Sequence, residues 1–371
     1  MSDFTSALYL GLHHSSRSLR PWVQLTAGKP AALGSSSGAE AVASQLAALL
    51  GCQRATLAPS TLHLFWDLFT ILAGERIVIY MDTGVYAIVR WGVERAAARG
   101  TPVRTFRHHD PDALRHQLKR GAQRGLRPVV VADGLCPACG GPAPIASYLE
   151  QVRSYGGYLI LDDTQALGIL GHRPELNAPY GKGGGGSLRW SHVHSPDVVI
   201  GSSLAKGFGV PVAVLAGSER MVRRFEQASA TRTHCSPPSN AVIHAADHAL
   251  FVNEQQGDRL RLRLWSLVSR FQNGMAKAGL STHGGDFPVQ TWEPSPDINP
   301  VEVHEALLQR GLMTVLHPAR HGFQAQISFL ITALHRVQDI DHATEALRLV
   351  TQRGASPEFP WEKHYEKSIQ L

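Results

Sequence analysis

The chain has 371 residues, enough for a large domain and a smaller one, and its 43% hydrophobic and 18% charged residues exclude intrinsic disorder. The formal net charge of +6 is spread along helix-like stretches without a recognition motif, so we expect no nucleic-acid partner. No apolar run reaches the roughly 18 residues that span a bilayer, and no secretory signal is visible, so we expect a cytoplasmic protein without a membrane segment.

Five short apolar runs rich in β-branched residues predict strands at residues 76–80, 128–132, 158–161, 197–200 and 212–215. Helical stretches at residues 85–99 and 111–124 lie between them. Nearly continuous apolar strands that alternate with helices are typical of an α/β domain with a mostly parallel central sheet. Ligands of such sheets bind at the carboxyl ends of the strands.

The glycine-rich stretch 180–188 does not match a phosphate-binding loop and predicts a flexible surface loop. A long amphipathic helix at 240–276 follows, and then strands at 287–291 and 324–331 and helices at 301–310 and 339–352. This pattern predicts a smaller α+β domain. The expected organisation is an N-terminal arm (1–37), a large domain (38–240), and a linker helix with a small C-terminal domain and tail (241–371).

Two polar segments follow predicted strands. Asp162 ends one strand, and Ser203 and Lys206 follow another. An acidic residue at a strand end is usually a cap or a turn residue, but a lysine among glycines there is unusual. Burial lowers the pKa of a lysine and makes its amine a nucleophile toward an aldehyde. A lysine for a Schiff base, an acid for a ring nitrogen and a hydroxyl for a phosphate together predict pyridoxal 5′-phosphate (PLP) as cofactor.

These segments resemble PLP-dependent enzymes of the aspartate aminotransferase fold (fold type I). The closer resemblance is to the α-oxoamine synthase family, which includes 8-amino-7-oxononanoate synthase. It rests on the segment Lys206-Gly-Phe-Gly-Val210 and on three further stretches: Tyr9-Leu-Gly-Leu12, Phe106-Arg-His-His-Asp110 and Asp133-Gly134. The resemblance implies a large domain that binds PLP on a mostly parallel sheet, with a smaller α+β C-terminal domain. The chain begins close to the first of these stretches, so we expect a less enclosed thioester site.

The resemblance also implies roles for individual residues. Lys206 corresponds to the Schiff-base lysine, which also acts as acid and base at the substrate α-carbon, and Asp162 to the partner of the pyridinium nitrogen. Ser203 and the backbone near Ser60 and Thr61 correspond to the phosphate contacts.

A later segment of the chain corresponds to a contact between subunits in the family. Thr233 or His234 lies where the partner subunit reaches the phosphate in the family. The resemblance therefore implies a homodimer with shared active sites.

The chain departs from the family at the cofactor and at the substrate. Gln165 replaces the histidine that touches the cofactor O3′, and Tyr86 replaces the histidine that stacks on the ring. Ser328 replaces the arginine that clamps the substrate carboxylate, a role that a neutral hydroxyl cannot fill. Either His317 or Arg320 supplies the charge, or the substrate lacks an ordinary α-carboxylate.

Three functions follow from this reading. The first is decarboxylative condensation of an amino acid with an acyl thioester, carried by CoA or by an acyl carrier protein. The second is transamination, or another PLP reaction, on an amine or a modified amino acid. The third is a non-catalytic subunit of an active homologue, against which the retained Lys206 and Asp162 argue. The substrate itself stays open.

The cysteines add one motif outside this resemblance. Cys136 and Cys139 have the CxxC spacing of a redox pair or of half a zinc site. Since no second ligand pair follows at a zinc-finger distance, we expect no metal site. The pair is interpreted as small residues in a turn after a strand, with a regulatory disulfide as the alternative.

Overall fold

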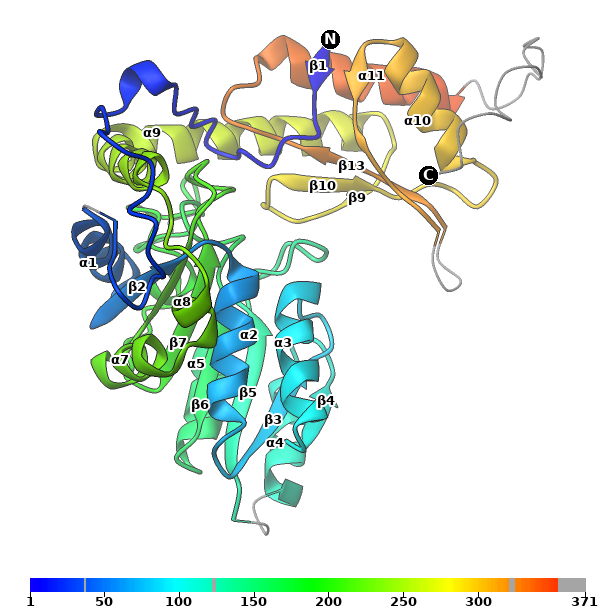
Figure 1. Ribbon diagram of the computed structural model, residues 1–371. Helices are drawn as coiled ribbons and strands as arrows, with labels where there is room; N and C mark the ends of the chain where they lie inside the picture. Colours follow the sequence, from blue (N-terminus) through cyan, green and yellow to red (C-terminus); the bar gives the residue numbers. More distant parts are fainter. Residues whose placement is uncertain (37, 122–124, 320–323, 353–371) are drawn as a thin grey trace, which may run out of the picture.

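A seven-stranded sheet forms the centre of the larger part of the molecule, in the lower half of Figure 1. The computed structural model describes residues 1–36, 38–121, 125–319 and 324–352. The strands from β7 to β4 are parallel, and β8 pairs antiparallel with both β7 and β2. In sheet order the strands are β2 (Arg54–Ala58), β8 (Ala213–Gly217), β7 (Val198–Ser203), β6 (Tyr158–Asp162), β5 (Arg127–Asp133), β3 (Ile77–Asp82) and β4 (Val103–Phe106). The predicted α/β class with a mostly parallel sheet is confirmed.

Apolar side chains cover both faces of this sheet. In β5, Val129 and Val131 belong to the apolar layer formed with α2, α3 and α7, whereas Val130 and Ala132 belong to the layer formed with α1, α4 and α5. This alternation follows from the two-residue period of a strand. The helices are α1 (Ala39–Leu50), α2 (Thr61–Leu72), α3 (Ala87–Ala98), α4 (Pro111–Gly121), α5 (Ile145–Arg153), α6 (Ser187–Trp190), α7 (Glu219–Ala228) and α8 (Ala230–His234).

The C-terminal part is built around a 38-residue helix, α9 (Asn240–Lys277), and an antiparallel four-stranded sheet of order β12-β13-β10-β9 (Figure 1). The remaining elements are β9 (Thr282–His283), β10 (Val289–Trp292), α10 (Pro300–Gln309), β11 (Leu312–Met313), β12 (Val315–His317), β13 (Gln326–Leu330) and α11 (Val337–Gln352). The predicted α+β character of this part is confirmed.

The N-terminal residues reach the C-terminal part. Strand β1 (Ser2–Asp3) pairs in parallel with β11, and a short 3-10 helix (Ser16–Ser18) follows before α1. The division into an arm and two domains stays a prediction. The charged tail expected at 356–371 lies outside the described residues.

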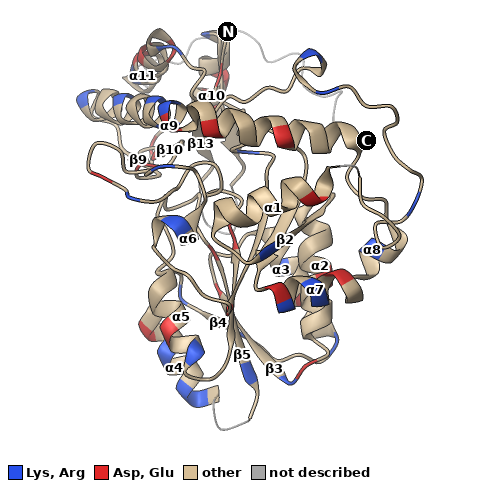
Figure 2. Cartoon of the chain, turned by 90° about the vertical axis from the view of Figure 1, so that its left-hand side faces the viewer, with Lys and Arg blue, Asp and Glu red and all other residues tan. Residues whose placement is uncertain are grey.

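Charged side chains are dispersed over the surface. Figure 2 shows Lys and Arg on several elements, α4, α7 and α9 among them, with Asp and Glu interspersed. Within the described ranges, no helix has the length and apolar character that crossing a membrane requires.

The glycine-rich segment 180–188 is not the surface loop that its composition predicts. Gly184 is buried with φ of 72°, and a Cβ there would lie 2.5 Å from Nη1 of Arg261 and 2.9 Å from the carbonyl oxygen of Gly168. The buried Arg261 guanidinium donates hydrogen bonds to the Gly168 carbonyl (2.9 Å) and to the Asn253 side chain (2.8 Å). The glycines therefore allow close packing against α9.

We expect Gly184→Ala to lower the free energy of unfolding by about 2–4 kcal/mol, because left-handed backbone strain and steric overlap add. Urea unfolding followed by circular dichroism measures the change. Gly28→Ala is the matched control, since Gly28 has φ of 65° and no atom lies within 4 Å of an added Cβ. Equal losses in the two variants would contradict the packing argument.

Candidate active site

Three buried carboxylates lie at the carboxyl ends of neighbouring strands. Asp82 ends β3, Asp133 ends β5 and Asp162 ends β6. The register of β5 and β6 pairs Asp133 with Asp162. Burial raises the pKa of Asp133 from 3.8 to about 8, and the charge of Asp162 adds to the rise. The carboxylates at this edge of the sheet therefore lack enough nearby positive charge to balance them.

Lys206 follows β7, the strand next to β6, and is half-buried. Burial lowers the pKa of its amine, whereas Asp162 and then Asp133 oppose that shift. Burial likewise raises the pKa of Asp162, against hydrogen bonds from Thr164 and the attraction of Lys206. The amine of Lys206 consequently loses its proton more readily than the amine of a surface lysine.

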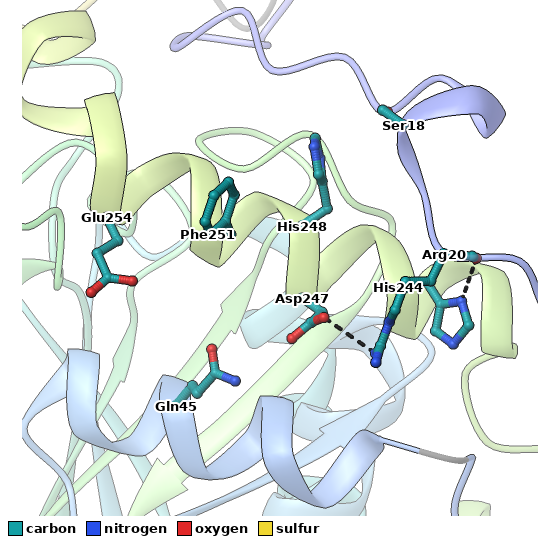
Figure 3. A pocket seen from close by; sticks show the side chains of 8 residues that line it. All are labelled: Ser18, Arg20, Gln45, His244, Asp247, His248, Phe251 and Glu254. Atoms are coloured by element: carbon teal, nitrogen blue, oxygen red, sulfur yellow. Dashed lines mark hydrogen bonds and ion pairs between the residues drawn. The ribbon is translucent and has the colours of Figure 1, made fainter.

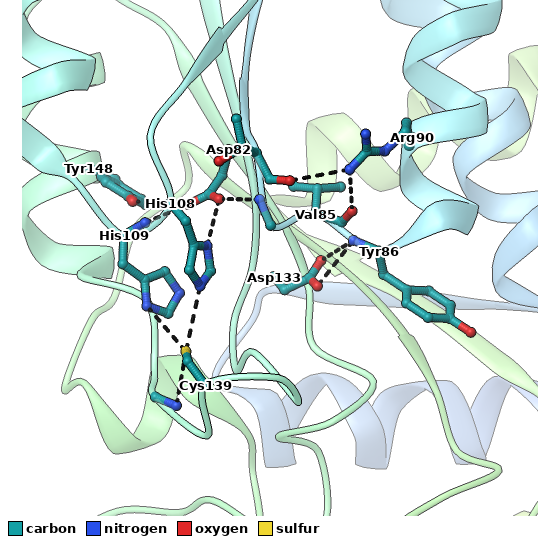
Figure 4. Close-up of polar contacts among 12 residues, drawn as sticks. Asp82, Val85, Tyr86, Arg90, His108, His109, Asp133, Cys139 and Tyr148 are labelled. Atoms are coloured by element: carbon teal, nitrogen blue, oxygen red, sulfur yellow. Dashed lines mark hydrogen bonds and ion pairs between the residues drawn. The ribbon is translucent and has the colours of Figure 1, made fainter. Parts of the chain in front are cut away.

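Tyr86 presents its ring to this amine. Lys206 Nζ lies 5.8 Å from the ring centroid, and the side chain of Tyr86 is 53% exposed. The Tyr86 backbone N–H donates to the Asp133 carboxylate at 3.1 Å, and Arg90 donates to the carbonyls of Thr83 and Val85 in the same turn (Figure 4). An aromatic ring held in this way can cover a planar ligand.

Gln165 is held by the N-terminal segment. Its Oε1 accepts a hydrogen bond of 2.9 Å from the Tyr9 hydroxyl. Burial raises the pKa of Tyr9, which keeps the phenol protonated as the donor. Since the oxygen of Gln165 is engaged, its amide NH2 remains as a donor toward a ligand.

Ser203 and the start of α2 share one edge of the sheet. Ala58 of β2 pairs with Ala213 of β8, which in turn pairs with Ser203. Ser60 is the N-cap of α2 and makes no side-chain capping bond; its hydroxyl lies 2.8 Å from Nδ1 of His63 instead. Thr61 begins the helix, and free N–H groups in a first turn bind anions.

Local hydrogen bonds fix the Ser203 segment. The Ser203 N–H donates to Thr164 Oγ1 at 3.0 Å, and its Oγ accepts from the Ala205 N–H at 3.2 Å.

Thr233 and His234, at the end of α8, are exposed, and their predicted contact with the phosphate of a second subunit stays a prediction.

A neutral, hydrogen-bonded group occupies the position where the resembled family has its carboxylate-binding arginine. Ser328 on β13 is 1% exposed, and its Oγ lies 2.7 Å from Thr291 Oγ1 and 2.8 Å from His317 Nε2. Burial lowers the pKa of His317, which favours the uncharged imidazole. Arg320 lies outside the described residues.

Three residues join the site without having been predicted there: Asp133, Thr164 and Tyr9. Asp133 and Tyr9 belong to stretches that carry the family resemblance, and Thr164 follows Asp162 by two residues. Their position within or next to these motifs was the sequence signal that could have identified them as site residues.

The raised pKa of Asp133 predicts a pH effect on stability. The pKa of this carboxyl is 3.8 in the unfolded chain and about 8 in the folded protein. Between these two pH values the unfolded chain loses the proton more readily than the folded protein, so the fold becomes less stable as the pH rises. We expect the free energy of unfolding of the cofactor-free protein to fall by up to about 1.4 kcal/mol per pH unit there, and Asp133→Asn to flatten the slope. Urea unfolding at several pH values measures it; an unchanged slope in the variant would contradict the assignment.

A pocket of about 330 Å³ lies apart from these residues, between the N-terminal segment, α1 and α9 (Figure 3). Arg20 and Asp247 form a partly exposed ion pair of 3.2 Å in it, and His244 hydrogen-bonds the Arg20 carbonyl at 2.7 Å. Its lining contains no described residue of the predicted site. The chemistry at the sheet edge, rather than the shape of the surface, identifies the candidate active site.

A model of the aminotransferase class I and II family matches residues 15–347. The chain belongs to this family. Among its curated members, 8-amino-7-oxononanoate synthase of Alcanivorax borkumensis is 28% identical over 305 residues (81% of this chain, 75% of that protein). The same enzyme of Sodalis glossinidius is 27% identical over 354 residues (93% and 87%).

Solved structures share the fold of this family member. Sphingomonas wittichii serine palmitoyltransferase superposes with a TM-score of 0.81 at 17% identity, covering 95% of this chain and 87% of that chain. The 8-amino-7-oxononanoate synthase of Francisella tularensis gives 0.73 at 17% identity (94% and 97%). The relatives confirm the predicted resemblance to α-oxoamine synthases and the fold type I architecture.

Proposed function

We propose that this chain is a PLP-dependent acyltransferase of the α-oxoamine synthase type. It condenses an amino acid with an acyl thioester, and it releases CO2 and the free thiol. The observation that carries the proposal is the placement of the Lys206 amine beside buried Asp162 and 5.8 Å from the centre of the Tyr86 ring, at the carboxyl edge of the sheet. The aminotransferase class I and II membership and the synthase relatives support it.

The residues present fit PLP. The site contains an amine of lowered pKa, a buried acid, an exposed aromatic ring and a helix N-terminus without a side-chain cap. Bound PLP would supply an aldehyde for the amine and a ring that withdraws electrons from the substrate α-carbon.

Lys206 and Asp162 carry the proton chemistry. The Lys206 amine, once free of the cofactor, removes and returns the proton at the substrate α-carbon. Asp162 holds the proton on the ring nitrogen, because a cation beside it relieves the unfavourable burial of the carboxylate. Tyr86 covers the ring face and keeps water away from it.

The remaining residues orient the cofactor. The Gln165 amide, whose oxygen is fixed by Tyr9, would hold the ring oxygen next to the aldehyde. Ser203 and the N–H groups near Ser60 and Thr61 bind the phosphate.

A second subunit completes the phosphate site in this proposal. Thr233 or His234 of each chain contacts the phosphate of the other, in a homodimer with shared active sites. A cytoplasmic location also stays a prediction.

The substrate side differs from an ordinary amino-acid clamp. Ser328 and His317 offer hydrogen bonds without a fixed positive charge, so they favour a substrate whose carboxylate is modified or bound by Arg320. This observation favours one second candidate, transamination of an amine or modified amino acid. The acyl donor of the first candidate is acyl-CoA or an acyl carrier protein.

Thiol release separates the two candidates. Purified protein with PLP is supplied with single amino acids and acyl-CoA, or with amines and 2-oxo acids. We expect CoA thiol and CO2 to appear together in equal amounts. Turnover of amines with 2-oxo acids while thioesters stay intact would replace the synthase by the aminotransferase.

We expect Ser328→Arg to lower the KM for simple α-amino acids by roughly 10-fold or more, since a charge-assisted pair contributes about 1.5–3 kcal/mol. Steady-state kinetics with glycine, alanine and serine measures it. Ser328→Ala is the control, because it also removes the hydroxyl bonded to Thr291 and His317 but adds no charge. An identical KM in both variants would exclude the missing cation as the cause of altered specificity.

A further inference from the structure

Two histidines and a cysteine come together over the end of β3, on loops that are far apart in sequence. His108 and His109 follow β4, whereas Cys139 lies in the turn after β5. Strand β3 separates these two strands in the sheet. Among the described residues, these three side chains place one nitrogen or sulfur atom each within 4.8 Å of one another. Figure 4 shows both rings directed toward the sulfur.

The spacing matches metal coordination. Cys139 Sγ lies 3.5 Å from His108 Nε2 and 4.0 Å from His109 Nδ1. A tetrahedral zinc ion about 2.3 Å from sulfur and about 2.1 Å from nitrogen would hold those atoms roughly 3.6 Å apart. The distances therefore suit a shared ion with little rearrangement.

A carboxylate orients the first histidine. Nδ1 of His108 lies 2.7 Å from Asp82 Oδ1, on the opposite side of the ring from Cys139. A proton on Nδ1 leaves the lone pair of Nε2 directed at the sulfur. Metal-binding histidines are commonly oriented by a carboxylate in this way.

The second histidine lies in the left-handed backbone region. His109 has φ of 53°, a conformation that few residues other than glycine adopt, although asparagine, aspartate and histidine are enriched there. The Asp82 carboxylate accepts a hydrogen bond of 3.0 Å from the His109 N–H. This hydrogen bond fixes the backbone that carries the His109 ring.

The cysteine is held by its turn. The Gly141 N–H donates to Cys139 Sγ at 3.4 Å, and the backbone of Cys136 pairs with that of Gly141 at 3.0 Å. Cys139 is exposed, so an ion can reach the sulfur from solvent. Cys136, three residues earlier in the same turn, is a buried free cysteine outside this group of three.

We propose that His108, His109 and Cys139 bind a zinc ion, with Cys136 or water in the fourth position. Thiolate and imidazole are the ligands that zinc prefers, and Cys139 releases its proton to solvent on binding. The ion links the loops after β4 and β5 above Asp82. Asp82 also accepts the Gly84 N–H at 2.7 Å, in the turn that carries Tyr86, so the ion steadies one wall of the candidate active site.

The test uses the full-length, PLP-loaded protein, stripped with a chelator under reducing conditions. Zinc titrated against a chromogenic zinc chelator gives the stoichiometry and the Kd. We expect one zinc per chain and an affinity at least about 10-fold weaker in Cys139→Ser and in His109→Asn. His109→Asn suits the left-handed backbone, so it removes the ligand without straining the fold.

Cobalt provides a second readout. Co2+ bound to the wild type should show a thiolate-to-cobalt charge-transfer band that is absent in Cys139→Ser. Cys235→Ser is the matched control, a free cysteine outside the cluster that should leave both measurements unchanged. Absence of stoichiometric zinc in the wild type, or equal zinc affinity in Cys139→Ser, would overturn the proposal.

Discussion

Lys206→Ala should lower product formation at saturating substrate by at least about 10³-fold, because the variant loses both the covalent attachment of PLP and the base at the substrate α-carbon. Borohydride reduction should fix the cofactor to the peptide that contains Lys206 in the wild type and to no peptide in the variant. Peptide mass spectrometry and the thiol-release assay measure the two effects separately.

Lys119→Ala is the matched control for this substitution. Lys119 is exposed on α4, so this substitution removes the same kind of side chain from a solvated position. It should retain both activity and borohydride trapping. Trapping that persists in Lys206→Ala, or turnover within about 10-fold of the wild type, would assign the Schiff base to another residue, because a positioned acid–base group alone contributes about 10²–10⁴-fold.

Asp162→Asn should slow turnover by about 10³-fold, because a neutral amide does not hold a proton on the ring nitrogen. The substitution also removes the largest influence that raises the pKa of Lys206. In the cofactor-free protein the amine should therefore titrate at a lower pH than in the wild type. Amine labelling at a series of pH values, mapped to the Lys206 peptide, measures that shift.

The exposed Asp112 provides the control for Asp162. Asp112→Asn on α4 makes the same change of charge on the surface and should leave kcat and the Lys206 titration unchanged. An upward shift of the Lys206 pKa in Asp162→Asn would contradict the electrostatic coupling of the two residues. Wild-type kcat in that variant would remove Asp162 from the proposed mechanism.

The fold was predictable where strands are buried on both faces. The runs that became β3, β5, β6, β7 and β8 are continuously apolar, as helices on both sides require. Strands β2 and β4 were not predicted. The first contains two alanines among five residues, and only one residue of the second is buried. Both lie at sheet edges, where the apolar pattern is weakest.

The site was predictable where strand ends converge. Lys206 and Asp162 follow neighbouring parallel strands, so their proximity follows from the sheet order. Asp133 carried part of the family resemblance but was not predicted as a site residue, because the sequence alone does not show that it pairs with Asp162 across β5 and β6. Cys139 and His108 lie beyond any such rule, since the loops that carry them flank a third strand. The expectation of no metal site considered ligands after the CxxC pair, whereas these histidines precede it.

The pairing of β2 with β8 joins residues 54–58 to residues 213–217. During synthesis from the N-terminus, strand β2 leaves the ribosome long before β8 exists, the one strand that pairs with it among the described residues. Ser60 and Thr61, which follow β2, therefore reach their places beside Ser203 only after that edge closes. Such distant pairing slows folding. A nascent chain that stops before residue 213 lacks the phosphate end of the proposed cofactor site, so cofactor capture should be a late event in the maturation of this protein.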